Sequence, residues 1–323
     1  MGFLYSQLFV SLPYPSASYA GKTVVVTGSN VGLGKEAAQH FARLGASKLI
    51  LAVRSLDKGA AAKRAIESAA GCDPSVVEVW HLDMSKYASV ESFAARVRAE
   101  LPRVDIFVAN AGVAHAKYNL MEEYEGTITV NVVSTLLLTA LVVPKMRETA
   151  AKFPGSRPTF TIVASEVHAW TDLPQRNAPE GEILATISED GRVDTEKLYP
   201  ISKLLEVFSV RAIAERYPAD KFPVTINCVN PGLCHSELGR DSDSWTFWLM
   251  KKALARTTEY GSRNLVAAAS LGAESHGTYV SDCAVDEPSP FVRSEEGKRT
   301  QDKVWKEVVG KLEAIHPGIM DKF

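Results

Sequence analysis

The sequence predicts an α/β fold in which helices cover both faces of one parallel, doubly wound sheet. Two observations predict it. Short apolar runs rich in β-branched residues alternate with longer segments of helical periodicity from residue 22 to residue 230. Several of the strand-like runs also end in Gly, Asn or Ser, which favour turns. Strands that alternate with helices form right-handed βαβ units, and such units build a single parallel sheet.

Six segments have the character of strands buried on both faces, because each is a short and nearly continuous apolar run. They are residues 22–28, 47–54, 75–83, 104–112, 159–165 and 223–230. Helical periodicity predicts helices over residues 34–45, 56–71, 85–101, 125–149 and 202–217. Gly45 and Gly71 fit C-terminal helix glycines, and Ser85 fits an N-cap. The apolar face of the third helix consists of Val90, Phe93, Ala94, Val97 and Leu101.

A glycine-rich segment, "TGSNVGLG" at residues 27–34, joins the first strand to the first helix. Gly28 permits a sharp turn, whereas Gly32 and Gly34 let the backbone approach a phosphate and let helix pack on strand. The following helix N-terminus offers free N–H groups to a pyrophosphate. A plain strand-to-helix turn rarely needs three glycines, so the segment predicts a Rossmann-type dinucleotide site.

The composition is that of an ordinary soluble globular protein, with 323 residues, 46% hydrophobic and 23% charged. A net charge of -2 and the absence of a basic run argue against a nucleic-acid partner. The four cysteines (72, 228, 234 and 283) are scattered, which fits neither a zinc site nor a disulfide scaffold. We expect no metal and a reducing, cytoplasmic location.

The chain is expected to form one domain, residues 21–285, with an extension at 1–20 and a charged helical tail at 286–323 that lies on the surface. The extension lacks the basic start and cleavage site of a signal peptide. Its apolar residues are expected to pack on the domain, with contact to a membrane surface as the alternative. The longest apolar stretch, from Val132, is shorter than the roughly 20 residues of a membrane span and is predicted to be a buried helix.

The spacing of the glycine loop is G-x-x-x-G-x-G, and five further marks follow it in order at the ends of strands or in helices. They are "ANAG" at 109–112, Asn131, Ser165, Tyr199 with Lys203, and "NPG" at 230–232. In these marks the sequence resembles the short-chain dehydrogenase/reductase family over residues 20–285. The residue sequences "TGSNVGLG", "LAVR" and "NPGLCHSEL" look most like those of fungal members related to retinol dehydrogenases, often found among secondary-metabolite tailoring reductases.

The end of the second strand predicts the cofactor. An NAD site usually has an acid there for the ribose 2′-hydroxyl, but this chain has Arg54, which can bind a 2′-phosphate. We therefore expect NADP(H); a surface arginine is the alternative. By resemblance, Asp83 hydrogen-bonds the adenine; it can also cap the next helix, in place of that role or beside it. Asn110 is implied to hold the strand end near the adenine ribose. The other cofactor residues implied are Gly28, Ser29, Asn30, Gly32, Leu33, Gly34, Tyr199, Lys203, Pro231, Gly232 and, at the carboxamide, Ser236.

Tyr199 and Lys203 are four residues apart, so on a helix they share one face. An ammonium beside a phenol favours the phenolate, so we expect Lys203 to lower the pKa of Tyr199 from its usual value near 10. Pro200 between them is compatible with an early helical turn. By resemblance, Tyr199 is the proton donor, Lys203 also holds the nicotinamide ribose, Ser165 polarises the substrate carbonyl, and Asn131 holds a water that leads to Lys203.

Two segments differ from compact family members. Ser165 and Tyr199 are 34 residues apart, and the insert at 166–198 is expected to be a surface flap in which His168 and Trp170 contact substrate or pack in the loop. Residues 240–256 match the family's variable substrate lid. There Trp245 and Trp248 belong to an apolar patch that can cover a bulky apolar substrate, pack as core, or meet a membrane or a second subunit in a homodimer.

These features predict an oxidoreductase that reduces a ketone or aldehyde of a small, apolar molecule with NADPH, or performs the reverse oxidation. A nucleotide-sugar epimerase is disfavoured by the glycine spacing, and a non-enzymatic NADP sensor by retention of the catalytic set. A tailoring protein whose fold mainly shapes a cyclisation stays open.

Overall fold

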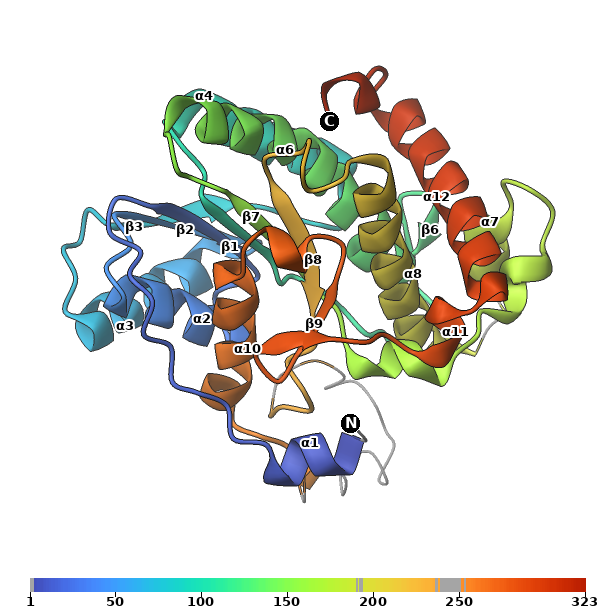
Figure 1. Ribbon diagram of the computed structural model, residues 1–323, viewed down its shortest axis with the longest axis horizontal. Helices are drawn as coiled ribbons and strands as arrows, with labels where there is room; N and C mark the ends of the chain where they lie inside the picture. The colour runs from blue at the N-terminus through green and yellow to red at the C-terminus, as the bar shows by residue number, and fades with distance from the viewer. Residues whose placement is uncertain (1–2, 190, 192–193, 236–237, 239–250, 253) are drawn as a thin grey trace.

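A computed structural model describes residues 3–189, 191, 194–235, 238, 251–252 and 254–323 (Figure 1). Its main sheet has the strand order β10-β9-β8-β7-β4-β1-β2-β3, and every neighbouring pair is parallel except β9 with β10. The strands are β1 (Thr23–Thr27), β2 (Lys48–Val53), β3 (Val77–His81), β4 (Ile106–Ala109), β7 (Thr159–Val163), β8 (Thr225–Val229), β9 (Tyr279–Ser281) and β10 (Ala284–Asp286). All six predicted strands are present, and the doubly wound fold is confirmed.

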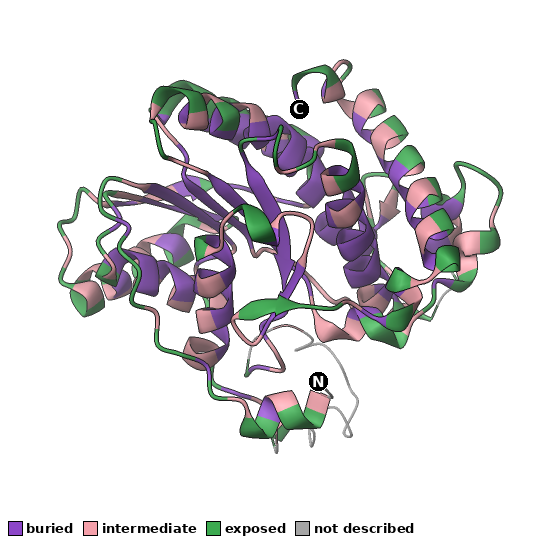
Figure 2. Cartoon of the chain, in the orientation of Figure 1, coloured by how far each residue is buried: buried purple, intermediate pink, exposed green. Residues whose placement is uncertain are grey.

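Alternate residues of each strand serve opposite faces of the sheet, as the pleat requires. In β1, Val25 belongs to one core, whereas Val24 and Val26 belong to the other. The first core lies under α4 (Tyr87–Glu100), α6 (Thr135–Lys152) and α8 (Thr195–Arg216). The second lies under α2 (Gly32–Arg43), α3 (Leu56–Ala70) and α10 (Thr258–Ser270), so helices cover both faces (Figures 1 and 2).

The longest buried helix contains a local irregularity. It runs through α5 (Gly126–Ile128), a π-helical turn at Thr129–Ser134 and α6, and is long and apolar enough to cross a membrane. Its most apolar window is completely buried inside the protein, as expected of a core helix. The π-turn, which the sequence did not predict, contains Asn131. Such turns are rare and occur often at functional sites.

The helix ends agree with the glycine predictions and correct one cap. Gly71 is left-handed at the end of α3, and Gly45, at φ +85°, follows the end of α2. The predicted N-cap at Ser85 is wrong, because α4 starts at Tyr87 after Lys86. Ser85 instead donates from its N–H and its hydroxyl to Oδ1 of Asp83, over 3.0 and 2.7 Å.

The insert at 166–198 is packed more firmly than a flap. It forms η2 (Glu166–Trp170), η3 (Pro174–Asn177), α7 (Ile183–Ile187) and the start of α8. Leu173, Ile183, Leu184 and Ile187 are buried in the first core. The Glu307 carboxylate of α12 (Glu295–Ile315) accepts from the N–H groups of Ile183 and Leu184 at 2.9 and 2.7 Å. Because α12 buries Val304, Trp305, Val308 and Leu312, the tail is part of the core as well as the surface.

The N-terminal extension packs on the domain, which is the arrangement that the sequence predicts. Within α1 (Phe3–Phe9), the Gln7 amide donates to the carbonyls of Leu233 and Leu254, both at 2.8 Å. Its oxygen accepts from the Leu233 N–H at 3.2 Å. The other face of α1 leaves Leu8 and Phe9 exposed. The described residues also form β5 (Leu120–Met121), β6 (Tyr124–Glu125), α11 (Pro290–Arg293), η4 (Ala273–Ser275) and η5 (Met320–Lys322).

Candidate active site

The carboxyl ends of β1 and β4 hold the glycine loop in a fixed shape. Gly28 has φ +64°, which disfavours any side chain. A Cβ on Gly34 would lie 2.4 Å from Nδ2 of Asn110 and 2.8 Å from the Gly28 carbonyl oxygen. Nδ2 of Asn110 donates to the carbonyls of Thr27, at 2.9 Å, and Gly28, at 3.3 Å. Asn110 therefore ties the "ANAG" segment to the loop.

The N-terminus of α2 fits a dinucleotide pyrophosphate. Val31 is its N-cap residue, and no side chain caps the helix there. The first N–H groups of the helix lack intrahelical partners, so they and the dipole favour an anion. Beside them, Asn30 and Leu33 are half-buried and Gly32, at φ +59°, brings no side chain. The Ser29 hydroxyl is buried and donates to the Val26 carbonyl at 2.9 Å, so it stabilises the turn.

The two residues expected at the adenosine end follow neighbouring strands. Arg54 is exposed directly after β2 and forms no ion pair within the described part of the chain. Asp83 follows β3 and is half-buried, and its Oδ1 atom organises the turn that leads into α4. The capping alternative for Asp83 is wrong, because the N-cap residue of α4 is Lys86 and no side chain caps that helix. The adenine contact stays a prediction.

Asn131 is completely buried and its amide is fully used by protein groups. Its Oδ1 accepts from the Val113 N–H at 2.9 Å, and its Nδ2 donates to the Val113 carbonyl at 2.9 Å and to the Ser202 hydroxyl at 3.0 Å. The Ser202 hydroxyl donates in turn to the Tyr199 carbonyl at 2.8 Å. Asn131 therefore links the end of the β4 segment to the helix that carries Tyr199.

Ser165 follows β7 with extended backbone, and its hydroxyl accepts from the Val167 N–H at 3.3 Å. Its carbonyl accepts from Nδ1 of His168 at 2.8 Å, whereas Nε2 of His168 accepts from the Ser289 N–H at 3.0 Å. Because His168 is 2% exposed with both nitrogens engaged, the structure agrees with loop packing, the second of its two predicted roles. Trp170 is 63% exposed at the end of η2.

Tyr199 and Lys203 lie on one face of α8, with the Lys203 ammonium 5.5 Å from the centre of the Tyr199 ring. The helix begins at Thr195, so Pro200 lies in its second turn. The expected lowering of the Tyr199 pKa is wrong for the net effect. Burial raises this pKa above its ordinary value. The Lys203 ammonium lowers it, but the carboxylate of Glu206 opposes that effect and raises it.

Glu206, which the sequence analysis missed, is buried one turn after Lys203. The Lys203 ammonium donates to its two carboxylate oxygens at 2.9 and 3.1 Å, and to the Val163 carbonyl at 2.8 Å. The sequence does carry a signal for it, because "KLLEVF" places an acid inside an apolar helical run. An acid at such a position needs a buried partner.

The "NPG" segment after β8 connects several parts of the site. The Asn230 side chain accepts from the Glu166 and Gly232 N–H groups at 3.1 and 3.0 Å. Gly232 has φ +76°, and a Cβ there would lie 3.1 Å from Oε1 of Gln7. Pro231 precedes it; Ser236, Trp245 and Trp248 lie outside the described residues.

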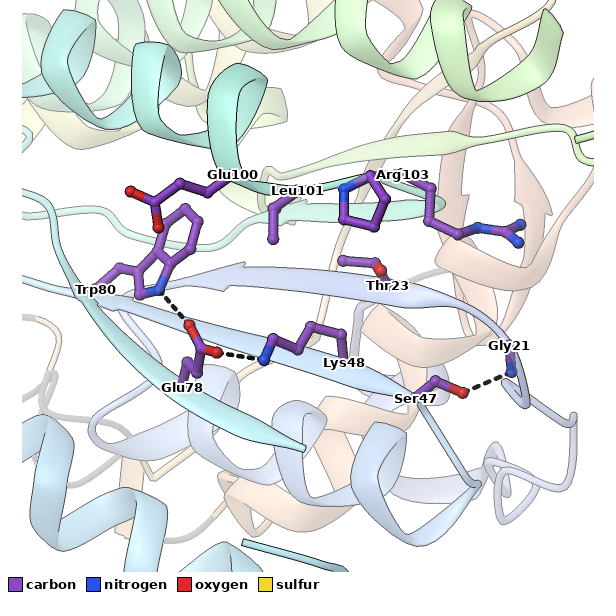
Figure 3. A pocket seen from close by; sticks show the side chains of 10 residues that line it. Gly21, Thr23, Ser47, Lys48, Glu78, Trp80, Glu100, Leu101 and Arg103 are labelled. Carbon is purple, nitrogen blue, oxygen red and sulfur yellow. Dashed lines mark hydrogen bonds and ion pairs between the residues drawn. The ribbon is translucent and has the colours of Figure 1, made fainter. Parts of the chain in front are cut away.

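A separate hollow of about 500 Å³ lies at the other end of the sheet (Figure 3). Thr23 and Lys48, which line the hollow, are the first residues of β1 and β2, so the hollow faces the amino ends of these strands. Its charges pair with protein groups: Lys48 with Glu78, and Arg103 with Asp105. It is therefore a poor candidate for the catalytic site. Among the described residues no cluster of His, Cys, Asp or Glu could hold a metal ion.

Sequence comparisons agree with this geometry. A family model described as short chain dehydrogenase matches residues 22–153. The short chain dehydrogenase/reductase dmxR8 of Cryptosporiopsis sp. (strain 8999) is 63% identical over 325 residues, which cover 100% of both chains. The short-chain dehydrogenase anuD of Penicillium roqueforti (strain FM164) is 40% identical over 99% of this chain and 84% of its own.

Solved structures share the fold at low identity. The 3-ketoacyl-(acyl-carrier-protein) reductase of Brucella melitensis, complexed with NADH, has a TM-score of 0.61 and 21% identity over 82% of this chain and 97% of its own. A protein of Escherichia coli CFT073 described as a short chain dehydrogenase, complexed with NADPH, has a TM-score of 0.60 and 20% identity over 84% and 99%. Because the full-length likeness to dmxR8 accompanies this fold, the chain belongs to the short-chain dehydrogenase/reductase family of oxidoreductases.

Proposed function

We propose that the protein is an NADPH-dependent reductase of a ketone or aldehyde on a small, apolar molecule of fungal secondary metabolism. One observation carries the proposal. Tyr199 and Lys203 share one face of α8, and a hydrogen bond with the side chain of Ser165, two residues after β7, lowers the pKa of Tyr199. β7 is separated from the glycine loop after β1 only by β4. The same arrangement also serves alcohol oxidation, which is the reverse reaction.

The cofactor supplies a hydride when it is bound. The chain's own residues supply the rest of the chemistry. The Ser165 and Tyr199 hydroxyls hold the carbonyl oxygen and disperse the charge that develops on it. Tyr199 donates its proton to that oxygen as the alkoxide forms. Lys203, buried beside Tyr199, stabilises the phenolate that remains until solvent returns the proton.

The choice of NADP(H) rests on Arg54. It is exposed after β2, where a 2′-phosphate would lie, and a guanidinium binds a phosphate bidentately. Relatives of the same fold have been solved with NADH and with NADPH, so the fold leaves both open. Direct titration with both nucleotides tests the choice, and tighter binding of NADH would contradict it.

NADPH consumption tests the activity, measured with a panel of ketones and aldehydes that includes polyketide-like compounds. We expect turnover of at least one bulky apolar carbonyl compound. Tyr199→Phe is expected to lower it by about 100-fold or more, because a positioned proton donor contributes that much. Tyr217→Phe is the matched control, since Tyr217 ends the same helix and packs on Phe222. If NADPH binds but no carbonyl is reduced, a protein that shapes a cyclisation becomes the better account.

A further inference from the structure

Glu206 has an environment unlike that of any surface acid. It is 2% exposed on α8, and both of its oxygens contact the Lys203 ammonium at 2.9 and 3.1 Å. The third bond of the ammonium goes to the Val163 carbonyl, at the end of the strand that precedes Ser165. The carboxylate thus fixes the ammonium between α8 and β7.

Such a pair is expensive to bury. Removing a carboxylate and an ammonium from water costs several kcal/mol per ion, and mutual attraction recovers this only with good geometry. A leucine at position 206 would fill the same part of the core at a lower cost in desolvation free energy. The pair is therefore poor evidence for stability, and its place beside Tyr199 suggests a chemical role.

The other ionisable groups around Glu206 leave Lys203 as its partner. The groups coupled to Glu206 are Lys203 and Tyr199 on α8 and Cys228 on β8. Arg211 of α8 acts on Cys228 as well. The η2 turn, which packs on α8, carries Glu166 and His168, and the ring of His168 contacts that of Tyr279 on β9. Burial raises the pKa of the Cys228 thiol and of the Tyr279 phenol, so both stay neutral. Burial lowers the pKa of His168, which also stays neutral near pH 7.

Glu206 and Lys203 act on Tyr199 in opposite senses. Burial raises the pKa of Tyr199, the Lys203 ammonium lowers it, and the Glu206 carboxylate raises it. Burial also raises the pKa of Glu206 itself to about 7. The carboxylate is therefore ionised above neutral pH. Without it, the Lys203 ammonium would favour loss of the Tyr199 proton in that range.

We propose that Glu206 is a positioning residue for the Tyr199–Lys203 pair: its buried carboxylate holds the ammonium and offsets part of its charge. Tyr199 then keeps, at alkaline pH, the proton that carbonyl reduction consumes. This inference rests on the proposed reductase function. It assigns Glu206 no contact with substrate or cofactor.

The test compares the wild type with Glu206→Gln and Glu206→Asp. Phenolate absorbance is titrated without cofactor, and each protein is paired with its own Tyr199→Phe variant so that the difference reports Tyr199 alone. We expect Glu206→Gln to move the Tyr199 midpoint down by about one to two pH units, since a nearby charge is removed. Glu206→Asp should restore it. Glu215→Gln, an exposed acid on the same helix that pairs with Lys298, should leave it unchanged.

An unchanged midpoint in Glu206→Gln would overturn the inference, even with a lower melting temperature. In the reductase assay, the alkaline limit of the rate should fall by the same amount. The titration needs no substrate, so it decides the role of Glu206 even if the reductase assay fails. If Glu206→Gln does not fold, Glu206→Leu takes its place in the same paired titration: a lower Tyr199 midpoint than in the wild type is expected, and an unchanged midpoint would overturn the inference.

Discussion

The side-chain amide nitrogen of Asn110 lies 2.4 Å from the position that a Cβ on Gly34 would occupy. The same nitrogen bonds the carbonyls of Thr27 and Gly28, so it cannot move without releasing the glycine loop. The glycine is thus required by a protein contact, in addition to any contact with a phosphate.

Gly34→Ala should therefore weaken cofactor binding by displacing Asn110. Overpacking of this kind costs about 1–3 kcal/mol, so we expect the Kd for NADPH to rise about tenfold or more with a lower melting temperature. Gly310→Ala is the matched control, because a Cβ on Gly310 of α12 meets nothing within 4 Å. Unchanged NADPH affinity in Gly34→Ala would contradict the packing argument.

Arg54→Ala should separate the two nicotinamide cofactors. Loss of a charge-assisted bond costs about 1.5–3 kcal/mol, so the Kd for NADPH should rise by about 10- to 100-fold, while that for NADH stays constant. Arg98→Ala, an exposed arginine on α4, provides the control. An equal loss for both nucleotides would show that Arg54 does not read the 2′-phosphate.

Gln7 joins two stems of the predicted substrate lid, Leu233 before it and Leu254 near its C-terminal end. Each bond contributes about 0.5–1.5 kcal/mol, so loss of both in Gln7→Ala should raise KM for a carbonyl substrate by about tenfold. Leu8→Ala alters the same helix on its exposed face and should leave KM unchanged. Steady-state kinetics with saturating NADPH measures both. A lower melting temperature at constant KM would reduce Gln7 to a structural role.

His168 should make stability depend on pH. Burial lowers its pKa below the ordinary value, against a smaller raising effect of the Ser165 carbonyl. The unfolded chain therefore binds a proton first as pH falls through about 6.5, and the contribution of His168 to folding is lost there, by at most about 1.4 kcal/mol per pH unit. Urea unfolding at pH 7.5 and 5.5 should show a smaller difference between wild type and His168→Asn at the lower pH. A constant difference would mean that His168 takes up a proton as readily in the folded protein as in the unfolded chain.

The strands and the glycine loop could be predicted because local pattern determines them. Continuous apolar runs indicate buried parallel strands, and the loop glycines have positive φ at positions 28 and 32. β9 and β10 escaped prediction since each has three residues, and β10 is exposed throughout. The π-turn at Asn131 was also missed, because its cause lies in the packing around it.

The candidate site was predicted in its residues but less well in its electrostatics. The spacing of Tyr199 and Lys203 indicates that they lie on one helical face. It does not reveal that the Lys203 ammonium is also bound by the Glu206 carboxylate. Likewise Gln7 lies 226 residues from Leu233, and no local pattern connects the two. Contacts between distant segments set the pKa of Tyr199 and position the two lid stems. Such contacts can be known only once the fold is known.

Hydride transfer tests the central claim most directly. NADPH that carries deuterium at the transferable position of C4 is supplied with a reducible carbonyl compound, and the product is analysed by mass spectrometry and NMR. We expect deuterium on the carbinol carbon with the wild type, and about 100-fold slower labelling with Tyr199→Phe at saturating NADPH. A product without deuterium, or equal labelling rates in the two proteins, would contradict carbonyl reduction with Tyr199 as the proton donor.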